Sequence, residues 1–153
     1  MLKAASGVLD RVLGTATNDN AAAGYVGEYN SAAVAAGSAV SLTTATTANV
    51  TTISLTAGDW DVSGIVQYTP TATTSVTQLT QGVSTLSATL SPQGTFSKFV
   101  TAANILTAID PAWSLPVVRL ALASTTTIYL VSNATFSVST LTAYGIITAR
   151  RVR

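Results

Sequence analysis

The side chains that most often perform chemistry in proteins are scarce in this chain. Its 153 residues include no histidine and no cysteine, and charged residues make up only 8% of it. Histidine is the commonest general base and metal ligand, and a thiolate nucleophile or a disulfide requires cysteine. A Ser-His-Asp site, a Cys-His site and a cysteine-ligated zinc are therefore excluded. We expect a protein that is not an enzyme and that holds no cofactor.

The six acidic residues offer one local pair. Asp59 and Asp61 stand at positions i and i+2, which share a face on a β-strand. Two carboxylates on one face are the beginning of a calcium site, because calcium prefers oxygen ligands. The isolation of the pair favours a different interpretation, in which Asp59 belongs to a turn and Asp61 faces solvent. We expect no metal site.

Basic residues gather at the end of the sequence, at Arg150, Arg151 and Arg153. Such a cluster can meet an acidic protein surface or DNA, but it is more often a solvated end or part of a salt bridge between subunits. Three arginines are a weak nucleic-acid signal, and no glycine-rich phosphate loop accompanies them. We expect no nucleic-acid partner.

The low charge content predicts self-association. Typical soluble domains carry about 25% charged residues, roughly three times the share found here. Charge therefore does little to keep this surface in solution, and we expect much of it to be buried against other chains. A poorly soluble monomer is the alternative.

The first 23 residues are interpreted as an anchor and a linker. Residues 1–14 form the helix candidate, which is short and interrupted by Gly7, so it would be marginal alone and needs a partner to pack on. Residues 14–24 are small and polar without a periodic pattern, as in a flexible linker. The apolar stripe that would bind the partner consists of Leu2, Val8, Leu9, Val12 and Leu13.

Neither a membrane span nor a secretory leader is expected. No run of 18 apolar residues occurs, and Asp10 and Arg11 interrupt the apolar stretch that a signal peptide requires. We expect synthesis in a cytoplasm and no insertion into a membrane.

From residue 24 onward the chain is predicted to be one all-β domain, 24–153. The clearest signal is 53–70, where a turn at 57–59 is followed by alternation from Trp60 to Tyr68 with an apolar residue or glycine at every second position. Such alternation is typical of a half-buried antiparallel strand. Further strands are expected at 38–43, 75–80, 82–90, 117–123, 127–132, 135–139 and from 143 to about 152. About eight short strands separated by turns indicate a sandwich or a barrel.

Segment 91–116 is too long for an ordinary hairpin loop. It holds Phe96, Phe99 and Trp113. We expect a loop that closes one end of the domain or packs on a sister subunit. A ligand-binding loop carrying these three aromatic residues is the alternative.

Two parts of the chain carry a resemblance to known families. Residues 55–64, LTAGDWDVSG, resemble a strand-turn-strand step of jelly-roll domains of the tumour-necrosis-factor and complement C1q type. Residues 124–131, 134–138 and 143–153 are similar to the C-terminal half of small bacteriophage structural proteins, which serve as decoration proteins, head fibres and tail-fibre tips. The resemblance covers about residues 24–153 and implies an antiparallel jelly-roll β-sandwich. The chain departs from the C1q type in its basic end and in lacking a calcium-ligand cluster.

The function that this resemblance implies is structural. In such phage proteins a short N-terminal segment attaches a trimeric head to the particle. The implied protein is a homotrimeric decoration or fibre subunit of the virion, made in the bacterial host cytoplasm, whose partners are other capsid or tail proteins. A trimer axis lined by apolar and aromatic side chains is also implied. The candidates for it are Tyr68, Tyr129, Tyr144 and Ile147.

The alternative function is that of a carbohydrate-binding adhesin, a receptor-binding fibre tip. In that case the exposed ring of Trp60 or Trp113 would stack on glycans of the host surface.

Overall fold

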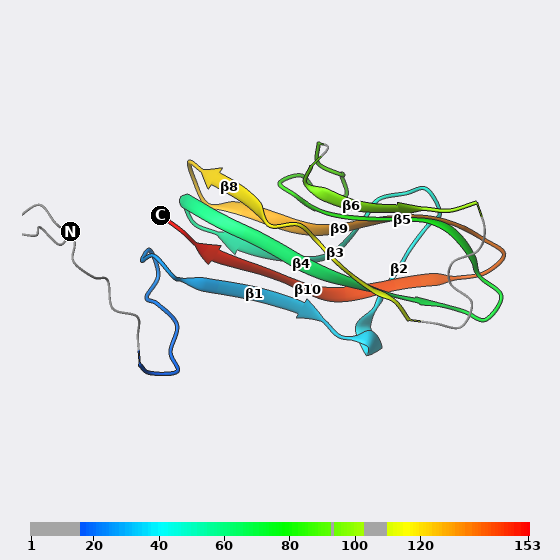
Figure 1. The fold of residues 1–153 in the computed structure, drawn as a ribbon, viewed down its shortest axis with the longest axis horizontal. Helices are drawn as coiled ribbons and strands as arrows, with labels where there is room; N and C mark the ends of the chain where they lie inside the picture. Colours follow the sequence, from blue (N-terminus) through cyan, green and yellow to red (C-terminus); the bar gives the residue numbers. More distant parts are fainter. Residues whose placement is uncertain (1–15, 93, 103–109) are drawn as a thin grey trace, which may run out of the picture.

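The computed structural model describes residues 16–92, 94–102 and 110–153. In these residues the chain forms two antiparallel β-sheets packed face to face (Figure 1). The predicted anchor residues Leu2, Val8, Leu9, Val12 and Leu13 lie outside the described residues. The elements are β1 (Tyr29–Val34), the 3-10 helix η1 (Ala36–Ser38), β2 (Val40–Ser41), β3 (Ala48–Leu55), β4 (Gly58–Pro70), β5 (Ser75–Ser84), β6 (Phe96–Val100), β7 (Ala112–Ser114), β8 (Val118–Leu122), β9 (Thr126–Ser137) and β10 (Leu141–Arg151).

The strand order is that of a jelly roll. The first sheet runs β1-β10-β4-β7, and the second runs β3-β9-β5-β6. Because β1 and β2 pair with successive parts of β10, and β7 and β8 with successive parts of β4, each of these pairs counts as one interrupted strand. The described chain then has eight strands, in which the first pairs with the eighth, the second with the seventh, the third with the sixth and the fourth with the fifth. This nested pairing is one long hairpin rolled into a sandwich, and it confirms the predicted fold class.

Strand β4 follows the predicted alternation. Trp60, Val62, Val66 and Tyr68 are fully buried between the sheets, whereas Ile65 on the opposite face is 45% exposed. The alternating apolar row thus forms the centre of the core. The Tyr68 hydroxyl is the polar exception, and it lies within hydrogen-bond distance of two buried groups on the second sheet, Gln81 Oε1 at 2.9 Å and Ser132 Oγ at 2.8 Å.

The pairing of β4 with β10 joins the third strand to the last. It runs without interruption from the Leu141–Pro70 pair to the Arg151–Trp60 pair. Two glycines let the backbones approach closely here. A Cβ on Gly145, which has φ +155°, would lie 2.0 Å from the Ile65 carbonyl oxygen, and one on Gly64 would lie 2.8 Å from the Ile146 carbonyl oxygen. A side chain at Gly145 cannot be accommodated without moving the backbone of β4.

Several strand assignments from the sequence were wrong although the fold class is right. Segments 75–80 and 82–90 were expected to be two separate strands, but β5 is a single strand that passes straight through Gly82. This glycine makes no turn. Its missing side chain leaves room for Phe96 of β6, which an added Cβ would approach to 3.0 Å. Likewise, the two strands expected at 127–132 and 135–139 fall on the single strand β9, which ends at Ser137.

Two strands lie inside the segment predicted to be a loop, and one lies in a stretch with no predicted strand. Strands β6 and β7 fall within 91–116 and complete the outer edges of the two sheets. Strand β1 has the sequence YNSAAV, with small residues and no strong alternation, and β10 is the strand with which it pairs. In these places pairing with distant strands decides the conformation.

Replacing Gly145 with alanine should destabilise the protein strongly. Because its Cβ would overlap the Ile65 carbonyl oxygen, we expect Gly145→Ala to lower the free energy of unfolding by at least about 2 kcal/mol, a fall in Tm of roughly 4–8 °C for a chain of this size. The matched control is Gly37→Ala, where an added Cβ meets nothing within 4 Å. Thermal denaturation followed by circular dichroism measures both. Equal Tm values for the two variants would contradict the close approach of β4 and β10.

Candidate functional site

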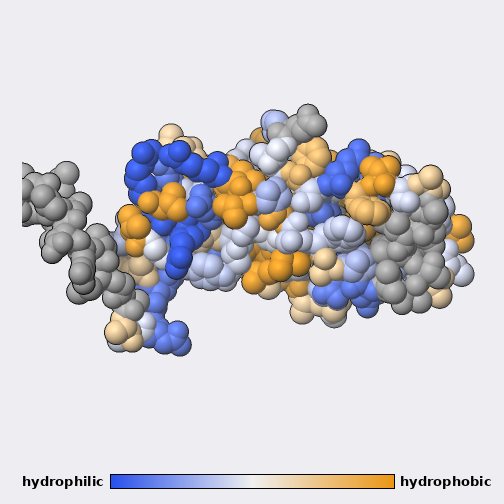
Figure 2. All heavy atoms as spheres, viewed as in Figure 1, coloured by the Kyte–Doolittle hydropathy of each residue, from blue (hydrophilic) through white to orange (hydrophobic). Residues whose placement is uncertain are grey.

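Charged side chains gather at one end of the sandwich, where β4 begins and β10 ends. Seven of the ten charged residues in the described ranges lie there. Figure 2 shows strongly hydrophilic residues concentrated at this end, close to where Figure 1 marks the C-terminus. The seven residues, named here the ionic cluster, are Glu28, Asp59, Asp61, Arg119, Arg150, Arg151 and Arg153.

A buried ion pair forms the inner part of the ionic cluster. Arg151 Nε lies 2.8 Å from Glu28 Oε2, and the two side chains are only 5% and 9% exposed. The guanidinium also donates to the Ala57 carbonyl at 2.8 Å and to the Thr56 hydroxyl, and it lies 4.3 Å from the centroid of the Trp60 ring. Arginine is thus satisfied by a carboxylate, by backbone and by an aromatic face together, as a buried guanidinium requires.

Glu28 in turn holds the leading segment of the domain, residues 16–28. Its carboxylate accepts the Gly24 N–H at 2.8 Å, and the amide of Asn20 bonds both the N–H and the carbonyl of Tyr29. The Gly24 N–H is the largest influence holding the pKa of Glu28 below its ordinary value, and Arg151 and Asn30 lower it further, against the opposing effect of burial. The chain therefore enters the domain at the end where its last strand finishes.

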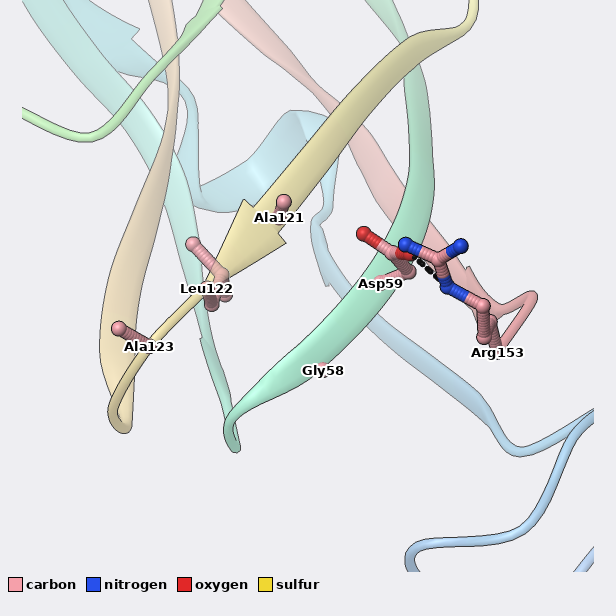
Figure 3. Close-up of a pocket in the computed structure, with 6 residues that line it drawn as sticks. All are labelled: Gly58, Asp59, Ala121, Leu122, Ala123 and Arg153. Carbon is pink, nitrogen blue, oxygen red and sulfur yellow. Dashed lines mark ion pairs between the residues drawn. The ribbon is translucent and has the colours of Figure 1, made fainter.

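A second ionic group lies on the outer side of the same end. One oxygen of Asp59, Oδ2, is 2.8 Å from Arg119 Nη2 and 2.6 Å from Arg153 Nε. The Asp59 side chain is 5% exposed, whereas the two arginines are 60% and 78% exposed. Arg119 is the first cause, and Arg153 a further one, of an Asp59 pKa below the ordinary value. Figure 3 shows Asp59 and Arg153 beside the end of β8, around a pocket of about 420 Å³.

These carboxylates are poorly suited to acid–base or metal chemistry. Glu28 and Asp59 are each satisfied by guanidinium groups, which hold them ionised and occupy the positions a cation would take. Asp59 belongs to strand β4 and is buried, which corrects its expected place in a turn. In the ranges 16–92, 94–102 and 110–153 no group of three or more potential ligands could hold a metal ion. In the same ranges no helix is long and apolar enough to cross a membrane.

The outer face of the first sheet, unlike the end that holds the ionic cluster, is largely uncharged. Beyond the row that contains Arg150 and Asp61, the side chains that β4 and β10 turn outward are uncharged. Ile65 is 45% exposed and stands opposite Ile146, and Val117, in the break between β7 and β8, is 66% exposed. A shallow hollow of about 270 Å³ lies there. Its lining is Ser63, Gly64, Ile65, Ser114, Leu115, Val117, Ile146 and Thr148.

The four predicted interface residues are not brought together. Tyr68 and Ile147 have no exposed surface and belong to the core, because both lie on inward positions of β4 and β10. Their assignment to a trimer axis was wrong. Tyr144 is partly exposed on the outer face of the first sheet, and Tyr129 is partly exposed on that of the second. An interface role for these two stays a prediction.

The aromatic residues of the predicted ligand loop lie on edge strands. Phe96 and Phe99 belong to β6 and Trp113 to β7, and the rings of Phe99 and Trp113 are 5.1 Å apart with planes tilted by 41°. Trp113 packs against the core, so this contact joins the free edges of the two sheets. Trp60 is fully buried and cannot stack on a sugar.

The ionic cluster was not predicted, although one signal for it exists in the sequence. Continuing the inward alternation of β10 through Ile147 and Ala149 places Arg151 on the buried face. A buried arginine needs an acidic partner. Glu28, which is 123 residues away, could not be chosen by spacing alone.

The fold and these surfaces define the chain as a jelly-roll β-sandwich with one ionic end and one uncharged sheet face. No protein-family model and no curated protein matches it. Among solved structures it is similar to VP2 of infectious bursal disease virus, in the crystal structure of the VP2 subviral particle, with 13% sequence identity and a TM-score of 0.42. The match covers 81% of this chain and 30% of that one. So distant a similarity carries no argument about function, and the jelly-roll assignment rests on the strand pairing.

The two lowered carboxylate pKa values predict a loss of stability in acid. A carboxylate whose pKa is lower in the folded than in the unfolded protein stabilises the fold at a pH above its unfolded pKa. This contribution is lost as the pH falls through its folded pKa. The ordinary values are 4.5 for Glu28 and 3.8 for Asp59. We therefore expect the free energy of unfolding to be constant near neutral pH and to fall from about pH 5 downward.

Glu28→Gln should lower stability at pH 7 and flatten this acid dependence, because the buried Arg151 loses its charged partner at every pH. Urea denaturation at pH 7 and at about pH 3.5 measures both effects. The control is Asp110→Asn, which changes an exposed carboxylate outside the ionic cluster and should keep the wild-type slope. A Glu28→Gln variant with the full acid dependence would contradict the role assigned to this pair.

Proposed function

We propose that this chain is a non-enzymatic structural subunit of a virus particle and that it associates with copies of itself through the outer face of its first sheet. The observation that carries the proposal is the absence of charge from the central part of that face, with Ile65 and Val117 exposed on it. An apolar, hydroxyl-rich sheet surface without charged residues is suited to packing against another protein.

The finer form of the proposal is a homotrimeric decoration or fibre protein of a bacteriophage. The resemblance of residues 24–153 to such proteins supports it, as does the low overall charge. The position of the leading segment supports it as well. Residues 16–28 are fastened beside the end of β10, so a preceding anchor would leave the domain at its ionic end.

An adhesin is less well supported. The hypothesis relied on an exposed tryptophan, but Trp60 is buried and Trp113 packs against the core and against Phe99. Glycan binding would have to use the partly exposed edge formed by Phe99 and Trp113, and a Trp113→Ala variant that loses binding on a glycan array would favour it.

Disrupting the uncharged face should dissociate the oligomer. We expect wild-type protein to have the mass of three chains at micromolar concentration in multi-angle light scattering. Ile65→Arg should weaken association at least tenfold, because a buried unpaired charge is costly at an interface. Its Tm should stay close to that of a wild-type subunit, since the side chain is 45% exposed.

The matched control is Leu86→Arg, which introduces the same charge at a site that is 63% exposed and lies outside the first sheet. This variant should retain the wild-type mass. A wild-type monomer at micromolar concentration would refute self-association, and an Ile65→Arg variant that keeps the wild-type mass would place the interface elsewhere.

Removing residues 1–14 should separate attachment from assembly. If these residues are the anchor, the shortened chain should keep its mass in light scattering but no longer bind the particle. Immunogold electron microscopy of intact virions, with full-length and shortened protein, measures this and also shows whether the protein lies on the head or the tail. A shortened protein that still decorates particles would contradict the anchor.

A further inference from the structure

The outer part of the ionic cluster has more positive than negative side chains. Arg119 and Arg153 both direct a single N–H group to the same oxygen of Asp59. Arg150 stands in the adjacent cross-strand row with Asp61 and Arg119. Three exposed arginines therefore face two aspartates, and one positive charge is left without a counter-charge among the side chains of this group.

Both guanidinium groups on Asp59 keep donors for a further ligand. A guanidinium has five N–H donors in a fixed fork, and the described contacts of Arg119 and Arg153 use one each. The two side chains are 60% and 78% exposed, whereas Asp59 beneath them is 5% exposed. Asp59 thus acts as a buried support that positions two arginines whose remaining donors are open to solvent.

A pocket lies directly beside these donors. Its volume is about 420 Å³, and Figure 3 shows Arg153 on one side of it and the end of β8 on the other. The β8 side is apolar, formed by Ala121, Leu122 and Ala123, and Gly58 also lines the pocket. The main chain fixes Arg153 in place, because Val152 N–H donates to the Asp59 carbonyl at 2.9 Å.

We propose that this pocket binds the carboxylate of an aspartate or glutamate in a partner protein segment, with Arg119 and Arg153 holding the oxygens and residues 121–123 contacting the adjoining apolar residue. A bidentate guanidinium matches a carboxylate in geometry. A polyanion such as nucleic acid requires a longer basic surface, and the apolar wall would contribute nothing to phosphate binding.

This inference goes beyond self-association through the sheet face, because the pocket is at the end of the domain and not on the uncharged face. It lies at the same end as the fastened segment 16–28. The partner would therefore be an unlike protein that meets the ionic end, and the test below does not depend on the oligomeric state.

The experiment titrates full-length, isotope-labelled protein with two blocked tripeptides, Ala-Asp-Ala and Ala-Asn-Ala, and follows the amide signals of Gly58 and residues 121–123 by NMR. Binding in the millimolar range by the aspartate peptide, at least tenfold tighter than by the asparagine peptide, is the expected result. Arg153→Gln should weaken it at least fivefold. This variant leaves Arg119 on Asp59, so the fold is retained. Lys98→Gln, which removes the same charge from the second sheet, should bind as wild type.

Each other outcome overturns the proposal. Equal affinity for the two peptides, or no saturable shift at Gly58 and 121–123, would exclude a carboxylate site. Unchanged binding by Arg153→Gln would place the ligand elsewhere. A short single-stranded oligonucleotide that binds more tightly than the peptide, with the same signals shifting, would assign the pocket to nucleic acid instead of protein.

Discussion

The pairing of β4 with β10 is the constraint on which the rest of the structure depends. When each interrupted strand is counted once, β4 is the third strand and β10 the last. Their pairing brings these distant parts of the chain into one sheet and so closes the nested hairpin into a sandwich. The contact requires Gly145 and Gly64, whose missing side chains let carbonyl oxygens of the opposite strand come close. It also sets both faces of the first sheet at once, since side chains opposite each other across the pair point to the same side. The buried row and the uncharged outer row are two consequences of one register.

Arg151 helps to select that register. A slip of one residue would carry it from the inner to the outer face and reverse every other side chain of β10. In the observed register its guanidinium meets Glu28, the backbone carbonyl of Ala57 and the ring of Trp60. Burying an ion pair gains little net stability, but separating one is costly. A slipped register would separate this pair, and in the observed register the pair joins the segment just before β1 to the end of β10.

Local patterns in the sequence were sufficient for the fold class and for β4. Alternation from Trp60 to Tyr68 predicted the buried face correctly because a strand with one face in the core has to alternate. The sequence placed strand breaks near Gly82 and Asn133, where tertiary contacts instead keep the strands continuous. Gly82 lies within β5 to admit Phe96, and Asn133 lies within β9 with its amide directed to Thr47. Both residues are typical of turns, and nothing local distinguishes these uses.

The candidate site could not be predicted from local patterns, for a related reason. Its members come from β4, β8, β10 and the segment before β1, so only the completed fold brings them together. Tyr68 shows the converse error. An aromatic residue with a polar group suits an interface in general, but here its hydroxyl bonds Gln81 and Ser132 across the core. Residue type alone could not distinguish the two environments.

The two surfaces differ in a way that bears on how such a subunit would work. In a cyclic assembly whose symmetry axis runs along the length of the sandwich, every copy presents the same end of its sandwich to the same side. The proposed carboxylate pockets and the leading segments would then lie together on one side of the oligomer. Weak contacts at each pocket would act jointly, since linked sites raise one another's effective concentration and gain affinity by a factor of about 10²–10⁴. A site that holds one carboxylate with millimolar affinity would in this way suffice for stable attachment, without any large interface on the individual subunit.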